Sequence, residues 1–117
     1  MLGGKKVTLQ DLIDKGVFEI IYKGNKLDKV ISKPFCCDLL SIAMSRAPKD
    51  SAWVTVMGNG NTLAVASLTE VSCVVLAEGS SLDEGSLNRA KAEDICVFST
   101  DMPIFEAANI INGYLHD

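Results

Sequence analysis

Two short apolar runs, separated by a segment of helical length, occupy the middle of the chain. Residues 53–57 and 73–77 are almost entirely apolar, and each has the length of a strand buried on both faces. Between them, a Gly-Asn-Gly-Asn turn leads into residues 62–71, which are apolar on nearly every side and so predict a largely covered helix. Because parallel strands need a crossover of this kind, the stretch predicts a right-handed βαβ unit.

Further strands are expected on both sides of this unit. The β-branched and aromatic run at 18–22 predicts the first strand, and the apolar run at 95–98 predicts the last. Alternating polar and apolar residues at 30–32 predict a strand at the edge of the sheet, where Lys29 and Lys33 discourage further pairing. We therefore expect a three-layer α/β/α fold with a mainly parallel five-stranded sheet. Residues 1–117 should form a single domain with an ordered core from about 8 to 115.

Capping residues predict where the first two helices begin. Thr8, followed by Asp11 and then by Gly16, predicts a short capped helix at 9–15. Asp38 is expected to open a helix that ends before Pro48 and buries a stripe at positions 39, 40, 43, 44 and 47.

Two further helices are expected after the central unit. Ser81 with Glu84 resembles a capping box for a helix that reaches about Ala92. Thr100 and Asp101 are expected to satisfy the first free N–H groups of a closing helix, whose apolar positions 104, 108, 111 and 115 share one face.

Composition and charge narrow the class of protein. The chain has 117 residues, of which 48% are hydrophobic, enough for one dense core and too many for a disordered tail. Its 11 basic and 15 acidic residues give a net charge of −4 without any basic block, so nucleic acid is not an expected partner. No apolar run has the length of a membrane span, and no secretory signal opens the chain. These features predict a cytoplasmic protein without a membrane partner.

Four cysteines stand at positions 36, 37, 73 and 96, and no pair has the CxxC spacing of a zinc or thioredoxin-like site. Cys73 and Cys96 fall inside apolar runs, where a free thiol packs as a small core side chain. Reduced structural thiols are therefore expected, with no metal site and no cofactor.

The candidate binding residues lie in three loops that follow predicted strands. The carboxyl ends of parallel strands share one rim of the sheet, and ligands of open α/β sheets bind at that rim. The turn after residue 57 can hold an anion at a helix N-terminus, although glycine and asparagine also suit any tight turn. The loop after residue 98 either only caps the next helix or also contacts a ligand. The candidates are Gly58, Asn59, Gly60, Asn61, Glu78, Gly79, Ser99, Thr100 and Asp101.

No catalytic constellation stands out in the sequence. The only histidine, His116, is next to last, so neither a Ser-His nor a Cys-His pair can be assembled around it. The acidic residues at 38, 50, 70, 78 and 101 are explained by caps or solvated loops. We therefore expect a protein that is not an enzyme.

Several segments together resemble the DRTGG-domain family. They are DLLS at 38–41, WVTV at 53–56, AVASL at 64–68 leading to VVL at 74–76, and STD at 99–101 with FEAA at 105–108. The resemblance implies an α/β fold similar to the N-terminal domain of bacterial HPr kinase/phosphatase. Members of the family occur beside CBS domains in regulated inorganic pyrophosphatases, in some phosphotransacetylases and as short free-standing proteins, in regulatory or subunit-bridging roles.

One departure from the family pattern concerns a ligand. Where the namesake motif has Thr-Gly-Gly after a strand, this chain has Ala77-Glu78-Gly79, and the Glu78 carboxylate would repel a phosphate-bearing ligand. We therefore expect first a non-catalytic regulatory or assembly domain acting through a homodimer or an unidentified protein partner. The alternative is a sensor of a nucleotide or phosphorylated metabolite at the rim. The expected homodimer patch comprises Leu63, Val65 and Ala66 or the neighbouring MGNGN turn.

Overall fold

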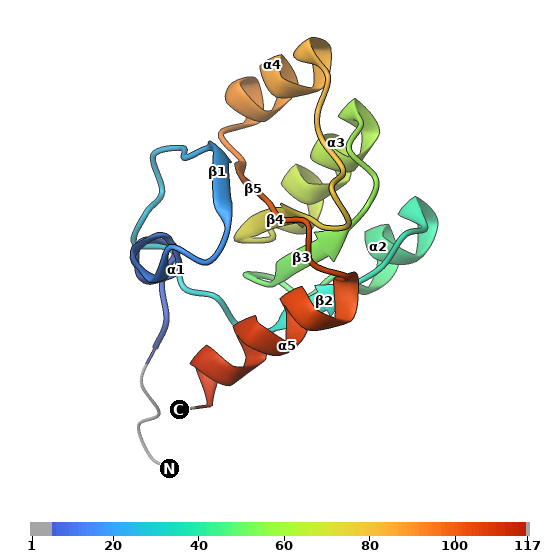
Figure 1. The fold of residues 1–117 in the computed structure, drawn as a ribbon. Coiled ribbons are helices and arrows are strands. Elements are labelled where there is room, and N and C mark those ends of the chain that lie inside the picture. The colour runs from blue at the N-terminus through green and yellow to red at the C-terminus, as the bar shows by residue number, and fades with distance from the viewer. Residues whose placement is uncertain (1–5, 117) are drawn as a thin grey trace.

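The computed structural model describes residues 6–116, which fold around a five-stranded sheet. The strands are β1 (Glu19–Tyr22), β2 (Pro34–Cys36), β3 (Ala52–Thr55), β4 (Cys73–Leu76) and β5 (Cys96–Ser99), in the order β1-β5-β4-β3-β2. Strands β2 to β5 run parallel, and β1 pairs antiparallel with β5 (Figure 1). The predicted mainly parallel sheet is confirmed, and so is the parallel pairing of β3 with β4 across their connecting helix.

Five helices cover the two faces of the sheet. They are α1 (Leu9–Lys15), α2 (Leu40–Arg46), α3 (Gly60–Thr69), α4 (Glu84–Glu93) and α5 (Ile104–Leu115). Helices α1 and α5 pack on one face, and α2, α3 and α4 pack on the other, which makes three layers (Figure 1). The longest helix has 12 residues, and no helix in the described part of the chain combines the length and apolar content that crossing a bilayer requires.

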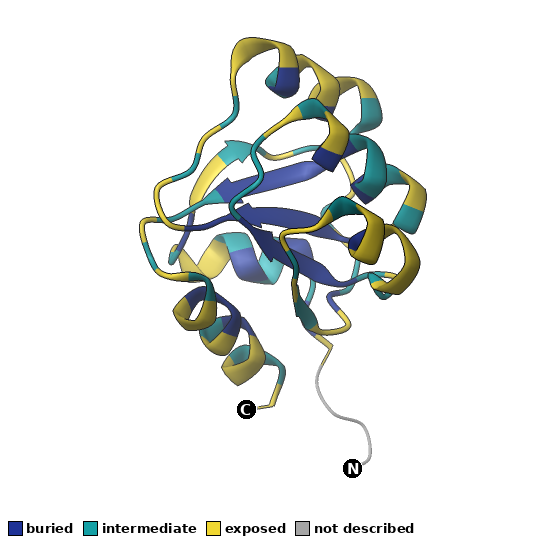
Figure 2. Cartoon of the chain, turned by 90° about the vertical axis from the view of Figure 1, so that its right-hand side faces the viewer, coloured by how far each residue is buried: buried dark blue, intermediate teal, exposed yellow. Residues whose placement is uncertain are grey.

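The sheet separates two apolar cores, and Figure 2 shows its buried central strands between helices with exposed outer sides. On the α1 and α5 side, the rings of Phe18 and Phe98 lie 6.1 Å apart in a tilted contact. On the other side, Trp53 is fully buried and its Nε1 donates a hydrogen bond to the Cys37 carbonyl, 2.9 Å away. Truncating a core aromatic of this kind to alanine typically costs about 3–5 kcal/mol.

The predicted edge strand at 30–32 is wrong in its residues, although a parallel strand does lie at that edge. Val30 makes only an isolated antiparallel bridge with Thr8, and the N–H of Ile31 donates to the Val7 carbonyl. This pairing ties the segment to the N-terminal region, with Ile31 buried in the core beside α1. The edge strand begins instead at Pro34, whose missing N–H is tolerated at the first position of an edge strand.

Two of the four predicted cap assignments concern the first half of the chain. The capping box of α1 is confirmed, with Thr8 and Asp11 bonded reciprocally. The assignment of Asp38 is wrong, because its Oδ1 accepts from the Thr55 hydroxyl at 2.6 Å and from the Val56 N–H at 2.9 Å. Asp38 therefore fixes the carboxyl end of β3, and α2 begins at Leu40 without a side-chain cap.

The two caps predicted in the second half are also wrong. Helix α4 is capped by Asp83, whose Oδ1 accepts from the Ser86 N–H at 2.7 Å, and not by Ser81. At α5, the Ile104 N–H donates to Glu78 Oε2 at 3.3 Å, so a residue from another loop takes the capping role predicted for Thr100 and Asp101.

Helix α2 buries less than its sequence pattern predicts. Only Ala43 is fully buried, while Leu39 at the helix start is 55% exposed and Met44 is 47% exposed. The helix lies beside the short edge strand β2, where little sheet surface is available to cover it. Helix α3 is better covered by its neighbours, although Leu68 is 69% exposed.

Candidate functional site

A hollow of about 380 Å³ lies at the carboxyl edge of β4 and β5. Val17, Glu19 and Ile21 line it from the β1 side, and residues 79–81 and 99–101 line it from the loops after β4 and β5. Its size falls in the range of small-molecule pockets, about 300–1,000 Å³. The rim position is the one at which open parallel sheets bind ligands.

The two loops of the rim hold each other by backbone hydrogen bonds. The Glu78 N–H donates to the Met102 carbonyl at 2.9 Å, and the Gly79 N–H donates to the Thr100 carbonyl at 3.0 Å. Glu78 and Gly79 both have left-handed backbone conformations, with φ of 59° and 76°. A non-glycine residue in this conformation persists only where its surroundings hold it. The loop conformation is therefore fixed by its partner loop.

Acidic and hydroxyl side chains dominate the polar lining. Glu19 and Asp101 contribute carboxylates, and the lining residues 80, 81, 99 and 100 contribute hydroxyls. The Ser99 hydroxyl donates to Glu19 Oε1 at 3.4 Å. Among the described residues that line the hollow, none is a lysine or an arginine. The hollow therefore presents negative charge together with hydroxyl groups that can donate as well as accept hydrogen bonds.

Both helices that begin near this rim already carry a carboxylate at their N-terminus. Glu78 accepts from the first turn of α5, and Asp83 accepts from the Ser86 N–H at the start of α4. Hydrogen bonds from the Ser86 backbone and side chain lower the pKa of Asp83. These carboxylates occupy N–H groups that could otherwise bind an anion.

The structure brings together only some of the predicted site residues. Gly79, Ser99, Thr100 and Asp101 line the hollow, while the Glu78 carboxylate is turned to the start of α5. The four residues of the turn at 58–61 do not line it. The predicted site residues therefore lie in two separate regions and do not form one continuous site along the rim.

The turn at 58–61 serves packing and capping in the described structure. A Cβ atom on Gly58 would lie 2.2 Å from the Ser81 carbonyl oxygen, so only glycine fits beneath the β4–α4 loop. Asn59 caps α3, with its Oδ1 accepting from the Thr62 N–H at 3.1 Å. Both roles account for the glycine and asparagine without an anion.

Five residues of the hollow are absent from the predicted candidate residues. Three of them lie in and just before β1: Val17 packs against the core beside α1 and α5, Ile21 packs against the other core, and Glu19 lies between them in sequence. Seeing them as site residues would have required knowing that β1 pairs with β5, a pairing distant in sequence. Ser81 had been assigned to the start of a helix, and it lies with Ser80 in the loop before α4.

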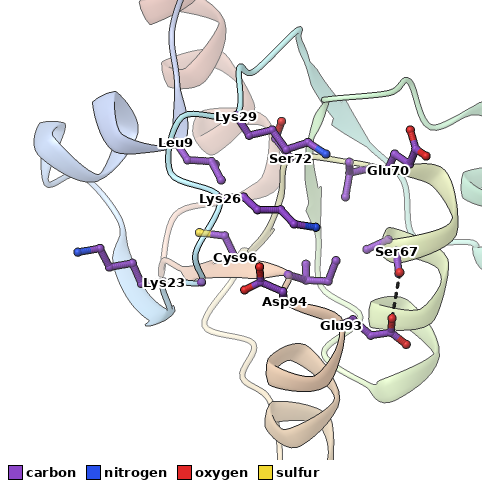
Figure 3. Close-up of a pocket in the computed structure, with 14 residues that line it drawn as sticks. Leu9, Lys23, Lys26, Lys29, Ser67, Glu70, Ser72, Glu93, Asp94 and Cys96 are labelled. Carbon is purple, nitrogen blue, oxygen red and sulfur yellow. Dashed lines mark hydrogen bonds between the residues drawn. The ribbon is translucent and has the colours of Figure 1, made fainter.

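A second, smaller pocket of about 70 Å³ lies at the opposite edge of the sheet, between residues 23–29 and the C-terminal ends of α3 and α4 (Figure 3). Its carboxylates already have partners: Glu93 accepts from the Ser67 hydroxyl at 3.0 Å, and Asp94 accepts from the Asn25 N–H at 3.1 Å. Figure 3 shows Lys26 extending towards these helix ends, which carry partial negative charge. Lysine side chains of the chain itself therefore line this pocket beside the carboxylates.

The cysteines lie apart from the hollow. Cys73 and Cys96 are buried in the sheet, and burial raises the pKa of both thiols, that of Cys96 to about 12. Cys36 lies on the edge strand, where much of the residue is exposed. Partial desolvation of its thiol and, to a smaller extent, the negative charge of Asp38 raise the pKa of Cys36. No group of three or more histidine, cysteine, aspartate or glutamate side chains within residues 6–116 is arranged to hold a metal ion.

A solved structure similar to this chain is the crystal structure of the CBS and DRTGG domains of the regulatory region of Clostridium perfringens pyrophosphatase, complexed with the activator diadenosine tetraphosphate. The two align with a TM-score of 0.73 and 18% sequence identity, over 93% of this chain and 47% of the other. The chain therefore spans about half the length of that structure. No family model and no curated protein sequence matches the chain. The likeness supports the DRTGG-like fold implied by the sequence segments.

Proposed function

We propose that the chain is a non-catalytic regulatory domain that works by associating with a second copy of itself. The observation that carries this proposal is a concentration of exposed apolar side chains on neighbouring helices. Of the six large hydrophobic residues exposed in the described chain, Leu39, Ile42 and Met44 belong to α2 and its start, and Leu68 belongs to α3. Exposed apolar side chains that gather in one region are typical of protein interaction surfaces.

The self-association surface that we propose differs from the homodimer patch expected from the sequence. Leu63 and Ala66 are fully buried against the sheet and the neighbouring helices, so they are not available to a second molecule. Helix α2 packs beside α3, so Ile42, Met44 and Leu68 lie on two adjacent helices of the same layer. We place the self-association surface on the outer sides of these two helices.

The structural neighbour supports a regulatory role without defining it. That structure contains the CBS and DRTGG domains of the regulatory region of a pyrophosphatase. A shared fold at 18% identity does not transfer a ligand or a partner, so the regulatory role of this chain is part of the proposal.

Sedimentation velocity at micromolar concentration tests the association. The wild type is expected to sediment as a particle of two chains, and Ile42→Asp or Leu68→Asp should raise the dissociation constant at least about tenfold, since a charge placed at an apolar contact loses burial energy. Phe105→Asp is the matched control, because Phe105 is 76% exposed on α5, in the opposite layer. A wild type that sediments as a single chain would refute the proposal.

A second candidate function is the sensing of a small ligand, and the hollow at the carboxyl edge favours it. The hollow is large enough for a small metabolite, and its loops are held in a defined conformation before any ligand binds. Binding there would shift the amide NMR signals of residues 79–81 and 99–101.

A further inference from the structure

The outer side of α2 combines two small residues with two apolar ones. Consecutive residues of a helix are turned by about 100° around its axis. Ser41 and Ser45, both exposed, therefore lie on the side opposite Ala43, which is fully buried. Ile42 and Met44, which are 44% and 47% exposed, lie on the two flanks of this serine pair. The exposed side of α2 is thus low along its centre and apolar on both edges.

The serine pair suits a close contact with another helix. The Ser45 hydroxyl donates within its own helix, to the carbonyls of Ile42 at 3.2 Å and Ser41 at 3.4 Å. Covering Ser45 therefore leaves no donor without a partner, which removes a main cost of burying a polar side chain. Side chains as small as serine allow two helix axes to approach to about 8 Å, the lower end of the usual range.

Opposite charges stand at the two ends of α2. Asp38 is exposed just before the helix, and Arg46 is exposed in its last turn. Within residues 6–116, neither side chain forms an ion pair. If α2 of a second copy runs antiparallel, Asp38 of each chain lies near Arg46 of the other, whereas a parallel arrangement sets like charges side by side. Charge therefore favours the antiparallel arrangement.

The neighbouring helices decide how far the contact extends. Helix α2 lies at the edge of its layer, beside α3 (Figure 1). Helix α3 has no charged residue, whereas α4 carries four. With seven residues, α2 is only about 10 Å long, too short to bury by itself the roughly 1,200 Å² of a stable interface. The contact therefore extends from α2 over α3, where Leu68 is exposed, and leaves α4 outside.

We infer that two copies of the chain join by packing α2 antiparallel on α2 about a two-fold axis. Ser41 of each chain lies opposite Ser45 of the other. The Ile42 side chains of the two chains contact each other on one side of the serines, and the Met44 side chains do so on the other side, as a two-fold contact requires near its axis. This inference rests on the proposed self-association and adds to it which helices meet, in which direction and in which register.

Disulfide formation between two different cysteine variants tests this register. Both variants are made on a Cys36→Ser, Cys37→Ser background, in which the remaining thiols are buried. An isotope-labelled Ser41→Cys chain is mixed with an unlabelled Ser45→Cys chain in a glutathione redox buffer, and mass spectrometry separates the mixed disulfide from those between like chains. The mixed disulfide is expected in at least about tenfold excess, because only positions 41 and 45 of different chains bring their Cα atoms within the roughly 7 Å that a disulfide spans.

Asn88→Cys with Ala92→Cys is the matched control, because these exposed positions have the same spacing on α4, outside the inferred contact. That pair should form no mixed disulfide in excess. An excess of disulfides between like chains at position 41 or 45 would show a parallel contact and overturn the inference. A random mixture, or no disulfide, from a protein that sediments as two chains would place the contact elsewhere and also overturn it, while self-association stands. A wild type that sediments as a single chain refutes both.

Discussion

Gly58 lies where the turn before α3 meets the loop before α4. The Ser81 carbonyl oxygen occupies the space in which a side chain at position 58 would begin, 2.2 Å from an ideal Cβ. Backbone atoms cannot move aside as a flexible side chain can, so an added methyl group must push the two loops apart. The small size of this residue is therefore a packing requirement.

Replacing Gly58 with alanine should destabilise the protein by about 1–3 kcal/mol, the usual cost of overpacking. Gly60→Ala is the matched control two residues on, because no atom lies within 4 Å of its Cβ position and it starts α3. Alanine in a helix is more favourable than glycine, so this variant should be neutral or more stable by up to about 1 kcal/mol. Urea unfolding measures both. Equal stability of the two variants would show that the loops yield freely.

Single carboxylates proved the hardest residues to assign from sequence. Asp38 was expected to open a helix, and Glu78 was expected to lie in a rim loop as a cap or a solvated residue. Asp38 instead bonds to β3, and Glu78 caps a helix 26 residues further along the chain. A capping pattern is local, whereas these bonds depend on which loops the sheet brings together. The same reason explains why Glu19 was missed as a residue of the hollow.

At the scale of elements, the start of α4 gives a test of capping. Asp83 accepts from the Ser86 N–H at 2.7 Å, whereas Ser81 lies outside the helix, in the loop before its cap. Asp83→Ala should lower the melting temperature by a few degrees at neutral pH, and Ser81→Ala should leave it nearly unchanged.

The effect of Asp83→Ala should also depend on pH with a defined sign. The hydrogen bonds from Ser86 lower the pKa of Asp83 in the folded state, so the ionised carboxylate stabilises the fold above the usual aspartate pKa of 3.8. This contribution is lost as the pH falls through the lowered folded pKa. Thermal unfolding at neutral pH and at about pH 2 should therefore show the gap between wild type and variant closing in acid. A gap that stays constant would show that the charge has no part in the cap.

For the elements themselves, the sequence pattern worked where burial was strongest. Strands β3, β4 and β5 were predicted to within two residues because each is a continuous apolar run that only a doubly covered strand can hide. The edge strand β2 failed because it has three residues, and its Pro34 and Lys33 resemble loop residues. Helix α2 looked buried from its pattern, yet an apolar stripe cannot tell how much sheet lies beneath it.

At the scale of the whole molecule, the sheet order places the stable part of the fold in its centre. Every residue of β3 and β4 is buried, and β5 is buried except for its last residue. The two edge strands β1 and β2 have only exposed or half-buried residues. Strands covered on both faces and paired on both sides open only when the whole domain unfolds, while edges open locally.

Amide hydrogen exchange should therefore separate the sheet into two classes. Hydrogen-bonded amides of β3, β4 and β5 are expected to exchange slowest, at rates that track the global free energy of unfolding when urea is added. Those of β1 and β2 should exchange faster and depend less on urea, because they become exposed in smaller openings. Exchange followed by NMR on the wild type and on Ile42→Asp makes the comparison. The edge amides of the wild type could exchange as slowly as those of the centre, and faster in Ile42→Asp. That result would show that the second copy protects the sheet edge beside α2 from exchange. If they stay equally slow in both proteins, the division into a stable centre and labile edges is wrong.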